Sequence, residues 1–361
     1  MKNIDDKTPL LIANKFTLNE NGGINQDATL LAKYLSKAGK FDFLSIDKIL
    51  DLKLPSPLLW EPRRFLVRKA INNKNIHVLS YEFMSSYFGF DYRKASKRSI
   101  CTVWDIYNIE VNRYIKRDPS IRDYFSPLER LNIINLKRNY SLVKNYDFVI
   151  THSKESRNKI VSELLAGDET NISVIGSIIE EKFFTIDLLF KDREVGNKKR
   201  TVIGFVNNFN WNKIKYLLYF IKIFKLIDDK NLEFHIYGPK FQFSEYIKGD
   251  NRIKYMGFMA DKDAVNVYST FDVYLSTSQL EGFGQPVMKA KAAGIPVLTY
   301  NGDVPEITKQ NTLIWDESNL YSIIRNHEWE KLDTKKAQQD AKNFLPGVVI
   351  PKYLKIYREI F

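Results

Sequence analysis

Residues 271–307 read FDVYLSTSQLEGFGQPVMKAKAAGIPVLTYNGDVPEI, and this stretch decides the fold. It opens with a short apolar run, residues 271–275, whose β-favouring side chains predict a strand. The loop Glu281–Gly284 follows, and its glycines let the backbone come close to a ligand. A helix is expected from Pro286, which suits a first helical turn, to Gly294, which suits a C-terminal cap.

The junction between this loop and the helix is a candidate anion site. The first N–H groups of a helix have no partner inside it, and its N-terminus is the positive end of the helix dipole. A phosphate is therefore the expected occupant near Pro286. Glu281 would place a carboxylate beside whatever that phosphate carries. Residues 295–300 predict the next buried strand, which completes a strand–loop–helix–strand unit.

Length and charge narrow the classes of function. The chain has 361 residues, which is comfortable for two domains. Its net charge is +12, but no basic patch coincides with a nucleic-acid-binding signature, so nucleic acid is not an expected partner. Phosphorylated ligands, an anionic membrane surface and a merely lysine-rich surface each explain the charge.

The cysteine, histidine and hydropathy patterns exclude several kinds of protein. No apolar run is long enough to cross a bilayer, and the first residues are not expected to be a signal peptide. The single cysteine, Cys101, rules out an internal disulfide and fits a reducing cytosol, so a cytoplasmic location is expected. The four histidines and the cysteine are not closely spaced, and no metal or other cofactor is expected.

Strand and helix patterns alternate along most of the chain, which predicts an α/β fold with parallel sheets. An apolar strand over residues 10–13 leads through Gly22 and Gly23 into a helix over residues 26–38. These glycines would let backbone N–H groups face a ligand, as in nucleotide-binding units. A plain β–α turn explains the same pattern and remains the alternative.

Residues 186–200 interrupt the alternation and show little periodicity, so we interpret them as a linker between two domains. The first domain would span residues 1–185 and the second residues 201–345. Pro346 interrupts the helical pattern near the end of the chain, and residues 346–361 are expected to contain a separate final helix.

A basic segment of the first domain is a candidate membrane contact. Trp60, Arg63, Arg64 and Arg68 fall within a predicted helix over residues 55–73. Such a helix would rest as a peripheral element on an anionic surface, here the inner face of the membrane. An ordinary amphipathic helix with a solvated basic face is the alternative.

From residue 278 to residue 307 the chain resembles the donor-binding region of family 4 retaining glycosyltransferases. These sugar transferases have the GT-B fold, and many of them take part in polysaccharide biosynthesis. These enzymes commonly show Glu-Gly-Phe-Gly, a proline, Ala-x-Gly-x-Pro-Val and then Pro-Glu. The matching residues are Glu281–Gly284, Pro286, Ala293–Val297 and Pro305–Glu306. The resemblance implies two Rossmann-like domains facing across a cleft, with residues 346–361 returning to the first domain.

The resemblance also implies an activity, the transfer of a hexose from a UDP- or GDP-type sugar to a glycan or lipid-linked acceptor, with retention of configuration and without a metal. Lys213 would neutralise a diphosphate oxygen and Glu281 would hold hydroxyls of the donor sugar, so both are catalytic candidates. Trp104 and Asp105 match a segment that contacts sugar or acceptor. The residues expected to bind the donor are Gly22, Gly23, Asn208, Gly257, Phe258, Phe283, Gly284, Gln285, Pro286 and Lys289.

Three positions differ from the family pattern. Lys289 stands where a second glutamate usually holds the ribose, and an ammonium cannot accept bonds from hydroxyls, so Lys289 is expected to reach a phosphate instead. Asn208 stands where the family has an arginine, and Trp104 where it has a histidine. A tryptophan can stack on a sugar face but cannot exchange a proton at neutral pH. A non-catalytic GT-B-fold glycan-binding or partner subunit and a nucleotide-sugar epimerase therefore remain alternatives.

Overall fold

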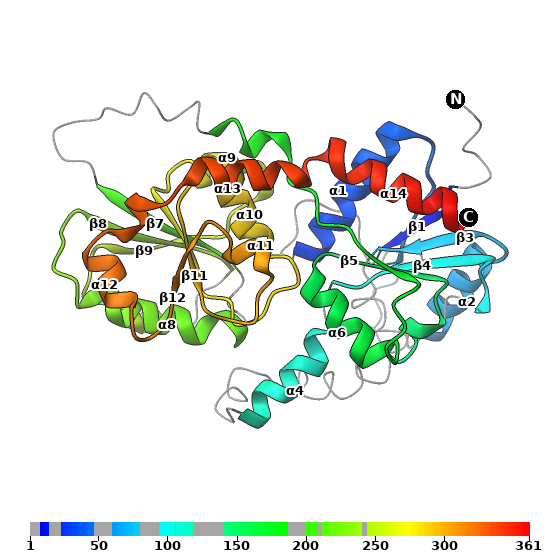
Figure 1. The fold of residues 1–361 in the computed structure, drawn as a ribbon, viewed down its shortest axis with the longest axis horizontal. Helices are drawn as coiled ribbons and strands as arrows, with labels where there is room; N and C mark the ends of the chain where they lie inside the picture. Colours follow the sequence, from blue (N-terminus) through cyan, green and yellow to red (C-terminus); the bar gives the residue numbers. More distant parts are fainter. Residues whose placement is uncertain are drawn as a thin grey trace. The chain divides into compact units, whose positions relative to one another are not determined.

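The computed structural model describes residues 8–13, 23–46, 60–79, 94–104, 106–117, 140–186, 200–207, 209, 211–239 and 244–361. Its chain forms two compact units, and Figure 1 labels many of their helices and strands. The first unit comprises Met1–Ile178 and Pro346–Phe361, and the second comprises Ile179–Leu345. The final segment of the chain thus belongs to the first unit.

The first unit is built on a six-stranded parallel sheet with the strand order β2-β1-β3-β4-β5-β6. The strands are β1 (Leu10–Ala13), β2 (Phe43–Ser45), β3 (Asn75–Val78), β4 (Arg98–Thr102), β5 (Phe148–Thr151) and β6 (Ile172–Val174). The helices are α1 (Gly23–Ala38), α2 (Trp60–Ile71), α4 (Tyr107–Arg117), α6 (Lys154–Leu164) and α14 (Pro346–Ile360), with a short 3-10 helix η6 (Val143–Asn145).

Both faces of this sheet are covered, which explains why β1 is apolar throughout. Leu10 and Ile12 point into one hydrophobic cluster, and Leu11 and Ala13 point into another. Successive side chains of a strand point to opposite faces, so a strand buried on both sides needs a continuous apolar run. The sequence of residues 10–13 meets that requirement.

The final helix α14 is anchored to the first unit through apolar and polar contacts. Its buried side chains join the cluster that also contains Leu31 and Leu35 of α1. Tyr357 places its hydroxyl 2.7 Å from Nδ1 of His77, and Nε2 of His77 lies 2.8 Å from Oγ1 of Thr102. Burial lowers the pKa of His77 to about 3, so this imidazole is neutral at physiological pH.

The second unit has a six-stranded parallel sheet with the order β12-β11-β10-β7-β8-β9. Its strands are β7 (Thr201–Val206), β8 (Leu232–Tyr237), β9 (Ile253–Gly257), β10 (Val273–Ser276), β11 (Val297–Tyr300) and β12 (Leu313–Trp315). Its α-helices are α8 (Trp211–Lys225), α9 (Ala264–Tyr268), α10 (Gln285–Ala292), α11 (Glu306–Lys309), α12 (Leu320–Arg325) and α13 (Thr334–Ala341). The 3-10 helices are η7 (Glu181–Phe183), η8 (Ser244–Tyr246), η9 (Asp261–Asp263), η10 (Glu328–Lys331) and η11 (Lys342–Phe344).

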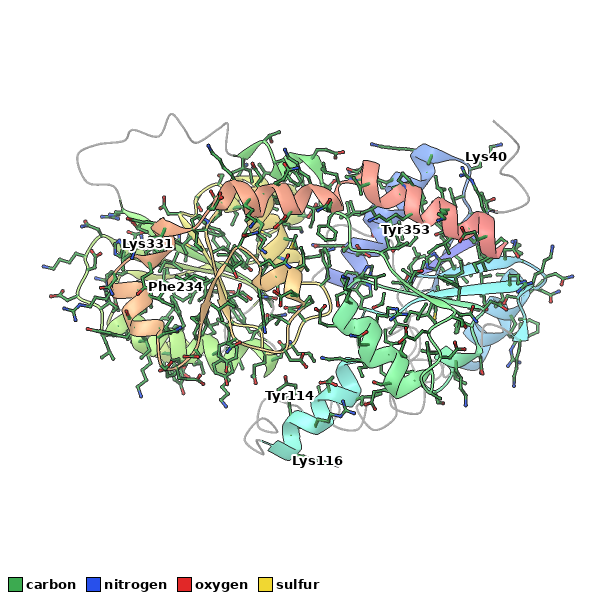
Figure 2. All side chains as sticks on the ribbon, viewed as in Figure 1. Lys40, Tyr114, Lys116, Phe234, Lys331 and Tyr353 are labelled. Atoms are coloured by element: carbon green, nitrogen blue, oxygen red, sulfur yellow. The ribbon has the colours of Figure 1, made fainter. Side chains whose placement is uncertain are left out.

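Aromatic side chains fill the core of the second unit, among them Phe234, which is labelled in Figure 2. Phe234 of β8 packs against Phe220 of α8 with ring centroids 4.8 Å apart. Tyr216 stacks on Tyr300 with ring centroids 3.7 Å apart.

The two parallel sheets confirm the predicted α/β class, and the final helix belongs to the first unit, as expected. Within the described residues, no helix is long and apolar enough to cross a membrane.

Candidate functional site

The loop Glu281–Gly284 lies between β10 and α10, as predicted. Two separate features of the structure require a glycine at its last position. Gly284 is the N-terminal cap of α10 and has a left-handed backbone with φ 79°. A Cβ added there would also lie 2.6 Å from Cγ2 of Thr308. Any other residue would therefore meet both backbone strain and a steric clash. Pro286 lies in the first turn of α10, as the sequence predicts.

Lys213 and Glu281 form the charged centre of this site. Nζ of Lys213 lies 3.1 Å from Oε1 of Glu281, and the two side chains are 10% and 20% exposed. Oγ of Ser278 donates a hydrogen bond to the same carboxylate oxygen at 2.7 Å. The pair is thus held in fixed geometry, and each side chain keeps a small exposed surface.

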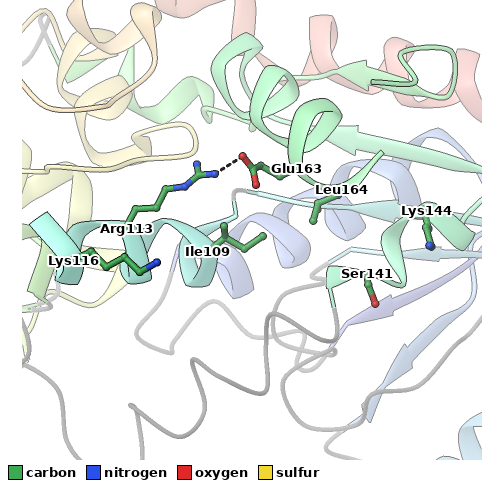
Figure 3. Close-up of a pocket in the computed structure, with 7 residues that line it drawn as sticks. All are labelled: Ile109, Arg113, Lys116, Ser141, Lys144, Glu163 and Leu164. Carbon is green, nitrogen blue, oxygen red and sulfur yellow. Dashed lines mark hydrogen bonds and ion pairs between the residues drawn. The ribbon is translucent and has the colours of Figure 1, made fainter. Parts of the chain in front are cut away.

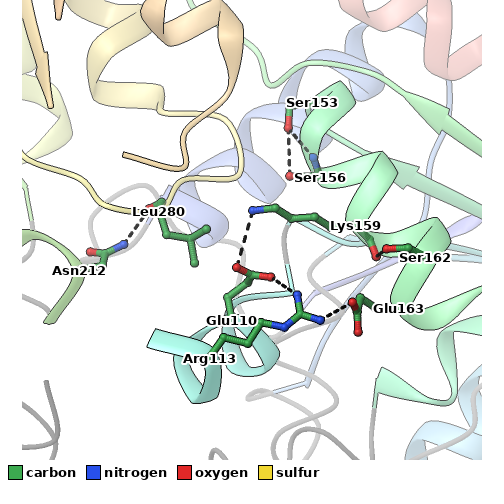
Figure 4. A network of polar contacts seen from close by, with 9 residues as sticks. All are labelled: Glu110, Arg113, Ser153, Ser156, Lys159, Ser162, Glu163, Asn212 and Leu280. Atoms are coloured by element: carbon green, nitrogen blue, oxygen red, sulfur yellow. Dashed lines mark hydrogen bonds and ion pairs between the residues drawn. The ribbon is translucent and has the colours of Figure 1, made fainter. Parts of the chain in front are cut away.

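Backbone contacts fix the two segments that carry this pair. The amide of Gln279 donates to the carbonyl of Asn212 at 2.8 Å, and Nδ2 of Asn212 donates to the carbonyl of Leu280 at 2.8 Å, a contact drawn in Figure 4. Oγ1 of Thr277 donates to the carbonyl of Lys213 at 2.9 Å. The first turn of α8 is therefore joined to the strand end that leads to Glu281.

Two buried tyrosines support the same edge of the sheet. Tyr274 of β10 donates from its hydroxyl to the carbonyl of Val206, the last residue of β7, at 3.0 Å. Tyr268 donates to the carbonyl of Pro286 at 3.2 Å. Burial raises the pKa of both phenols well above the usual value, so they act as neutral donors at all physiological pH values.

Lys289 lies in a cluster of charged side chains around Phe183. Its Nζ is 4.0 Å from Oδ1 of Asp261 and 5.4 Å from the centre of the Phe183 ring. Lys182 contacts the same aspartate at 3.2 Å and Glu180 at 2.8 Å. Burial disfavours the charged form of Lys182, but these carboxylates outweigh it and raise its pKa. No local pattern in the sequence marks Glu180, Lys182 or Asp261 for this cluster.

The other predicted donor-binding residues occupy varied surroundings. Gly257 ends β9 with φ 84°, and Phe258 beside it is 50% exposed. Phe283 is buried, with its ring 4.9 Å from that of Phe344. Gln285 is the buried first residue of α10. Gly23 begins α1, whereas Gly22 and Asn208 lie outside the described residues.

The first unit contains a buried polar cluster at the carboxyl ends of β4 and β5. The rings of Trp104 and His152 lie 4.2 Å apart between centres. Nδ1 of His152 donates to the carbonyl of Ile175 at 2.7 Å, because a carbonyl can only accept. Its Nε2 lies 3.6 Å from Oδ2 of Asp27, and Asp27 also accepts a hydrogen bond from Ser177. Burial lowers the pKa of His152, and Asp27 opposes this shift.

The sequence singles out Trp104 but neither Asp27 nor Ser177, which belong to the same cluster. Asp27 and Ser177 belong to no motif and meet only through the fold, so nothing local indicates them. Asp105, the other predicted sugar contact, lies outside the described residues. The predicted membrane-contact residues Trp60, Arg63 and Arg64 lie on α2, where the structure does not describe their side chains, and Arg68 is exposed.

A cavity of about 430 Å³ lies in the first unit between α4, η6 and the end of α6 (Figure 3). Arg113 is bonded to Glu110 at 2.9 Å and to Glu163 (Figure 4). Lys159 lies 3.9 Å from Glu110. The cavity is lined by Ile109, Arg113, Lys116, Ser141, Lys144, Glu163 and Leu164, so cations outnumber carboxylates. No pattern in the sequence predicts this cavity, because its lining comes from three separate segments.

Among the residues that the structure describes, no group of three or more His, Cys, Asp or Glu side chains is arranged to hold a metal ion.

Part of the second unit matches a known protein family. Residues 200–326 match the family described as "Glycosyl transferases group 1". The O-antigen chain mannosyltransferase B of Escherichia coli is 27% identical over 100 residues, which cover 26% of this chain and 26% of that protein. The chain thus matches about a quarter of the length of that relative.

Solved structures match the whole chain in fold. Sucrose-phosphate synthase (tll1590) from Thermosynechococcus elongatus has a TM-score of 0.74 at 15% identity, covering 98% of this chain and 99% of that one. Anabaena Alr3699/HepE in complex with UDP and glucose has a TM-score of 0.67 at 16% identity, covering 98% and 100%. The chain therefore has the GT-B fold, and residues 200–326 in its second unit match the family described as "Glycosyl transferases group 1".

Proposed function

We propose that this protein is a retaining, metal-independent glycosyltransferase that moves a sugar from a nucleotide-diphosphate donor to a glycan or lipid-linked acceptor. The observation that carries the proposal is the Lys213–Glu281 pair, 3.1 Å apart, beside the N-terminus of α10. Both residues lie inside the segment that matches the glycosyltransferase family.

The pair suits a ligand that is anionic at one end and hydroxylated at the other. The ammonium of Lys213 would bind a diphosphate oxygen and stabilise the charge that grows as the sugar leaves. The carboxylate of Glu281 would accept hydrogen bonds from sugar hydroxyls. The two opposite charges compensate each other, so neither is largely buried without a partner.

In the proposed reaction the sugar–phosphate bond breaks and a bond to the acceptor oxygen forms on the same face of the sugar. The proton of the acceptor hydroxyl passes to the leaving phosphate oxygen, so the donor supplies its own base. Glu281 orients the sugar without attacking it. The N–H groups in the first turn of α10 would add donors to the departing diphosphate.

The relatives are consistent with this donor class. A mannosyltransferase matches part of the chain in sequence, and a neighbour in fold is a complex with UDP and glucose. The donor base and sugar of this chain are to be identified by titration with UDP, GDP and their sugar conjugates, using calorimetry. Absence of binding by all of them would contradict the proposal.

On the acceptor side, the cavity in the first unit favours an anionic ligand. Lys116 and Lys144 line it, together with the apolar side chains of Ile109 and Leu164. A phosphate next to an apolar chain, as in a lipid-linked sugar, matches that lining. Replacing Lys116 and Lys144 by glutamate should raise the KM for such an acceptor and leave the KM for the donor unchanged.

A binding subunit without catalysis is the second candidate. Trp104 favours it, because an indole packed against His152 occupies the position where the family has a histidine. The assay that separates the two candidates is hydrolysis of a bound nucleotide sugar. A subunit of this kind would bind the donor without any turnover.

A further inference from the structure

Lys291 is a charged side chain that the site described above does not use. It lies in the last turn of α10 and has no exposed surface. Lysine is rarely buried to this extent, because its ammonium loses hydration unless acceptors replace the water. The groups around it therefore indicate its role.

The ammonium of Lys291 donates to two backbone carbonyls at the C-terminal end of α11. Its Nζ lies 2.6 Å from the carbonyl oxygen of Ile307 and 2.5 Å from that of Gln310. Carbonyls at this end of a helix lack partners within it and attract positive charge. The other carbonyls of residues 305–310 accept hydrogen bonds from nearby amides and hydroxyls. Lys291 therefore donates to the two carbonyls, those of Ile307 and Gln310, that these groups do not bind.

The same segment supports the opposite end of α10. Thr308, in the middle of α11, is buried and packs so closely on Gly284 that a Cβ added to this glycine would lie 2.6 Å from Cγ2 of Thr308. Gly284 is the cap from which α10 begins. Helix α10 therefore contacts α11 at both ends, by packing of Gly284 on Thr308 at its start and by the hydrogen bonds of Lys291 at its end. Figure 1 shows the two helices as neighbours.

The charged groups that face Lys291 come from α11 and α13. Burial lowers the pKa of Lys291 to about 8, although the carboxylates of Asp340 and Glu306 favour its charged form. Asp340 also accepts a hydrogen bond from Asn311 at 2.6 Å, which holds α13 to the segment after α11. The ammonium form therefore predominates at pH 7.

We propose that Lys291 is a positioning residue for the loop Glu281–Gly284. The ammonium of Lys291 holds α11 in place through its two hydrogen bonds. Thr308 of α11 packs on Gly284, and Gly284 caps the start of α10, directly after the loop that carries Glu281. The consequence for donor binding rests on the proposed function, whereas the link between Lys291 and the loop is testable without any ligand.

The test is local hydrogen exchange measured by mass spectrometry. Lys291→Met keeps the apolar stem of the side chain and removes the donors, and Lys335→Met, an exposed lysine of α13, is the matched control. Peptides covering residues 281–288 and 305–311 should exchange about tenfold faster in Lys291→Met, and those of β7 and β8 should not change. Unchanged exchange at residues 281–288, or equal acceleration across the whole second unit, would overturn the proposal.

Lys291→Gln keeps two N–H donors without the charge, so it provides a milder variant should the methionine variant not fold. A smaller acceleration at the same peptides is expected, and none at all would count against the proposal. Titration with UDP and GDP then adds the functional arm, in which Lys291→Met weakens nucleotide affinity about tenfold. A wild-type protein that binds neither nucleotide contradicts the proposed function, and the exchange data alone then decide on Lys291.

Discussion

At the scale of single residues, the proposed roles of Lys213 and Glu281 make opposite predictions for binding and turnover. Glu281→Ala removes the acceptor for sugar hydroxyls but leaves the ammonium of Lys213 free for phosphate. Turnover should fall by a factor of about 10² to 10³, while the Kd for the nucleotide changes little or improves. Lys213→Ala should instead weaken nucleotide binding directly, because the cation itself is lost.

The measurements for this pair are nucleotide calorimetry and a donor-hydrolysis rate on the same preparations. Ser278→Ala is the matched control, since it removes only one hydrogen bond to the carboxylate of Glu281 and should cost far less turnover. Equal rates for Glu281→Ala and the wild type would remove Glu281 from the mechanism.

Lys291 makes a separate prediction about stability and pH. Its folded-state pKa of about 8 lies below the value of 10.5 for a free lysine, so the unfolded state binds more protons between these two pH values. The wild type should therefore gain stability relative to Lys291→Met as pH rises from about 8 to 10.5, by at most about 1.4 kcal/mol per pH unit. Below pH 8 the difference should be flat. Urea midpoints of both proteins across this range test it, and parallel curves throughout would contradict the lowered pKa.

At the scale of elements, the contact between Tyr357 and His77 is one of the polar contacts that hold α14 inside an otherwise apolar interface. Tyr357→Phe would leave Nδ1 of the buried His77 without its partner at 2.7 Å. A loss of about 1–3 kcal/mol in the unfolding free energy of the first unit is expected. Lys355→Ala, an exposed substitution on the same helix, should change it by less than about 0.5 kcal/mol.

The membrane hypothesis for α2 also belongs to this scale. Phe65 is 68% exposed on this helix and Arg68 is exposed beside it, which is the combination an anionic bilayer surface favours. Replacing Arg63, Arg64 and Arg68 by glutamate should abolish flotation with anionic vesicles. The control replaces Lys331, Lys335 and Lys336 by glutamate. This changes the net charge by the same amount, but at exposed positions of the second unit. If both variants float alike, the helix makes no specific contact.

At the scale of the whole molecule, the sequence predicts what periodicity and local backbone chemistry determine. The strand–loop–helix order around Gly284 follows from alternating apolar runs, glycines and a proline, and the structure shows it. Contacts between segments that are distant in the sequence cannot be predicted in this way. The bond from Lys291 to Gln310 and the contact of Asp27 with His152 each join parts of the chain that no pattern relates. A buried lysine inside an apolar helix looks, in the sequence, like any surface lysine.

The division of the chain into two units predicts which unit unfolds when the C-terminal helix α14 is removed. A stop codon in place of Pro346 deletes α14, which contributes Val349, Ile350, Tyr353, Ile356 and Tyr357 to the core of the first unit. Each buried apolar side chain of this size contributes about 1.5–3 kcal/mol, and a domain is stable by only about 5–15 kcal/mol in total. The first unit should therefore unfold, while the second unit, which contains residues 179–345, keeps its own thermal transition. Scanning calorimetry of full-length and truncated protein tests this, with Tyr357→Phe as the mild variant that should only lower the first transition. Loss of both transitions on truncation would mean that the second unit requires the first in order to fold.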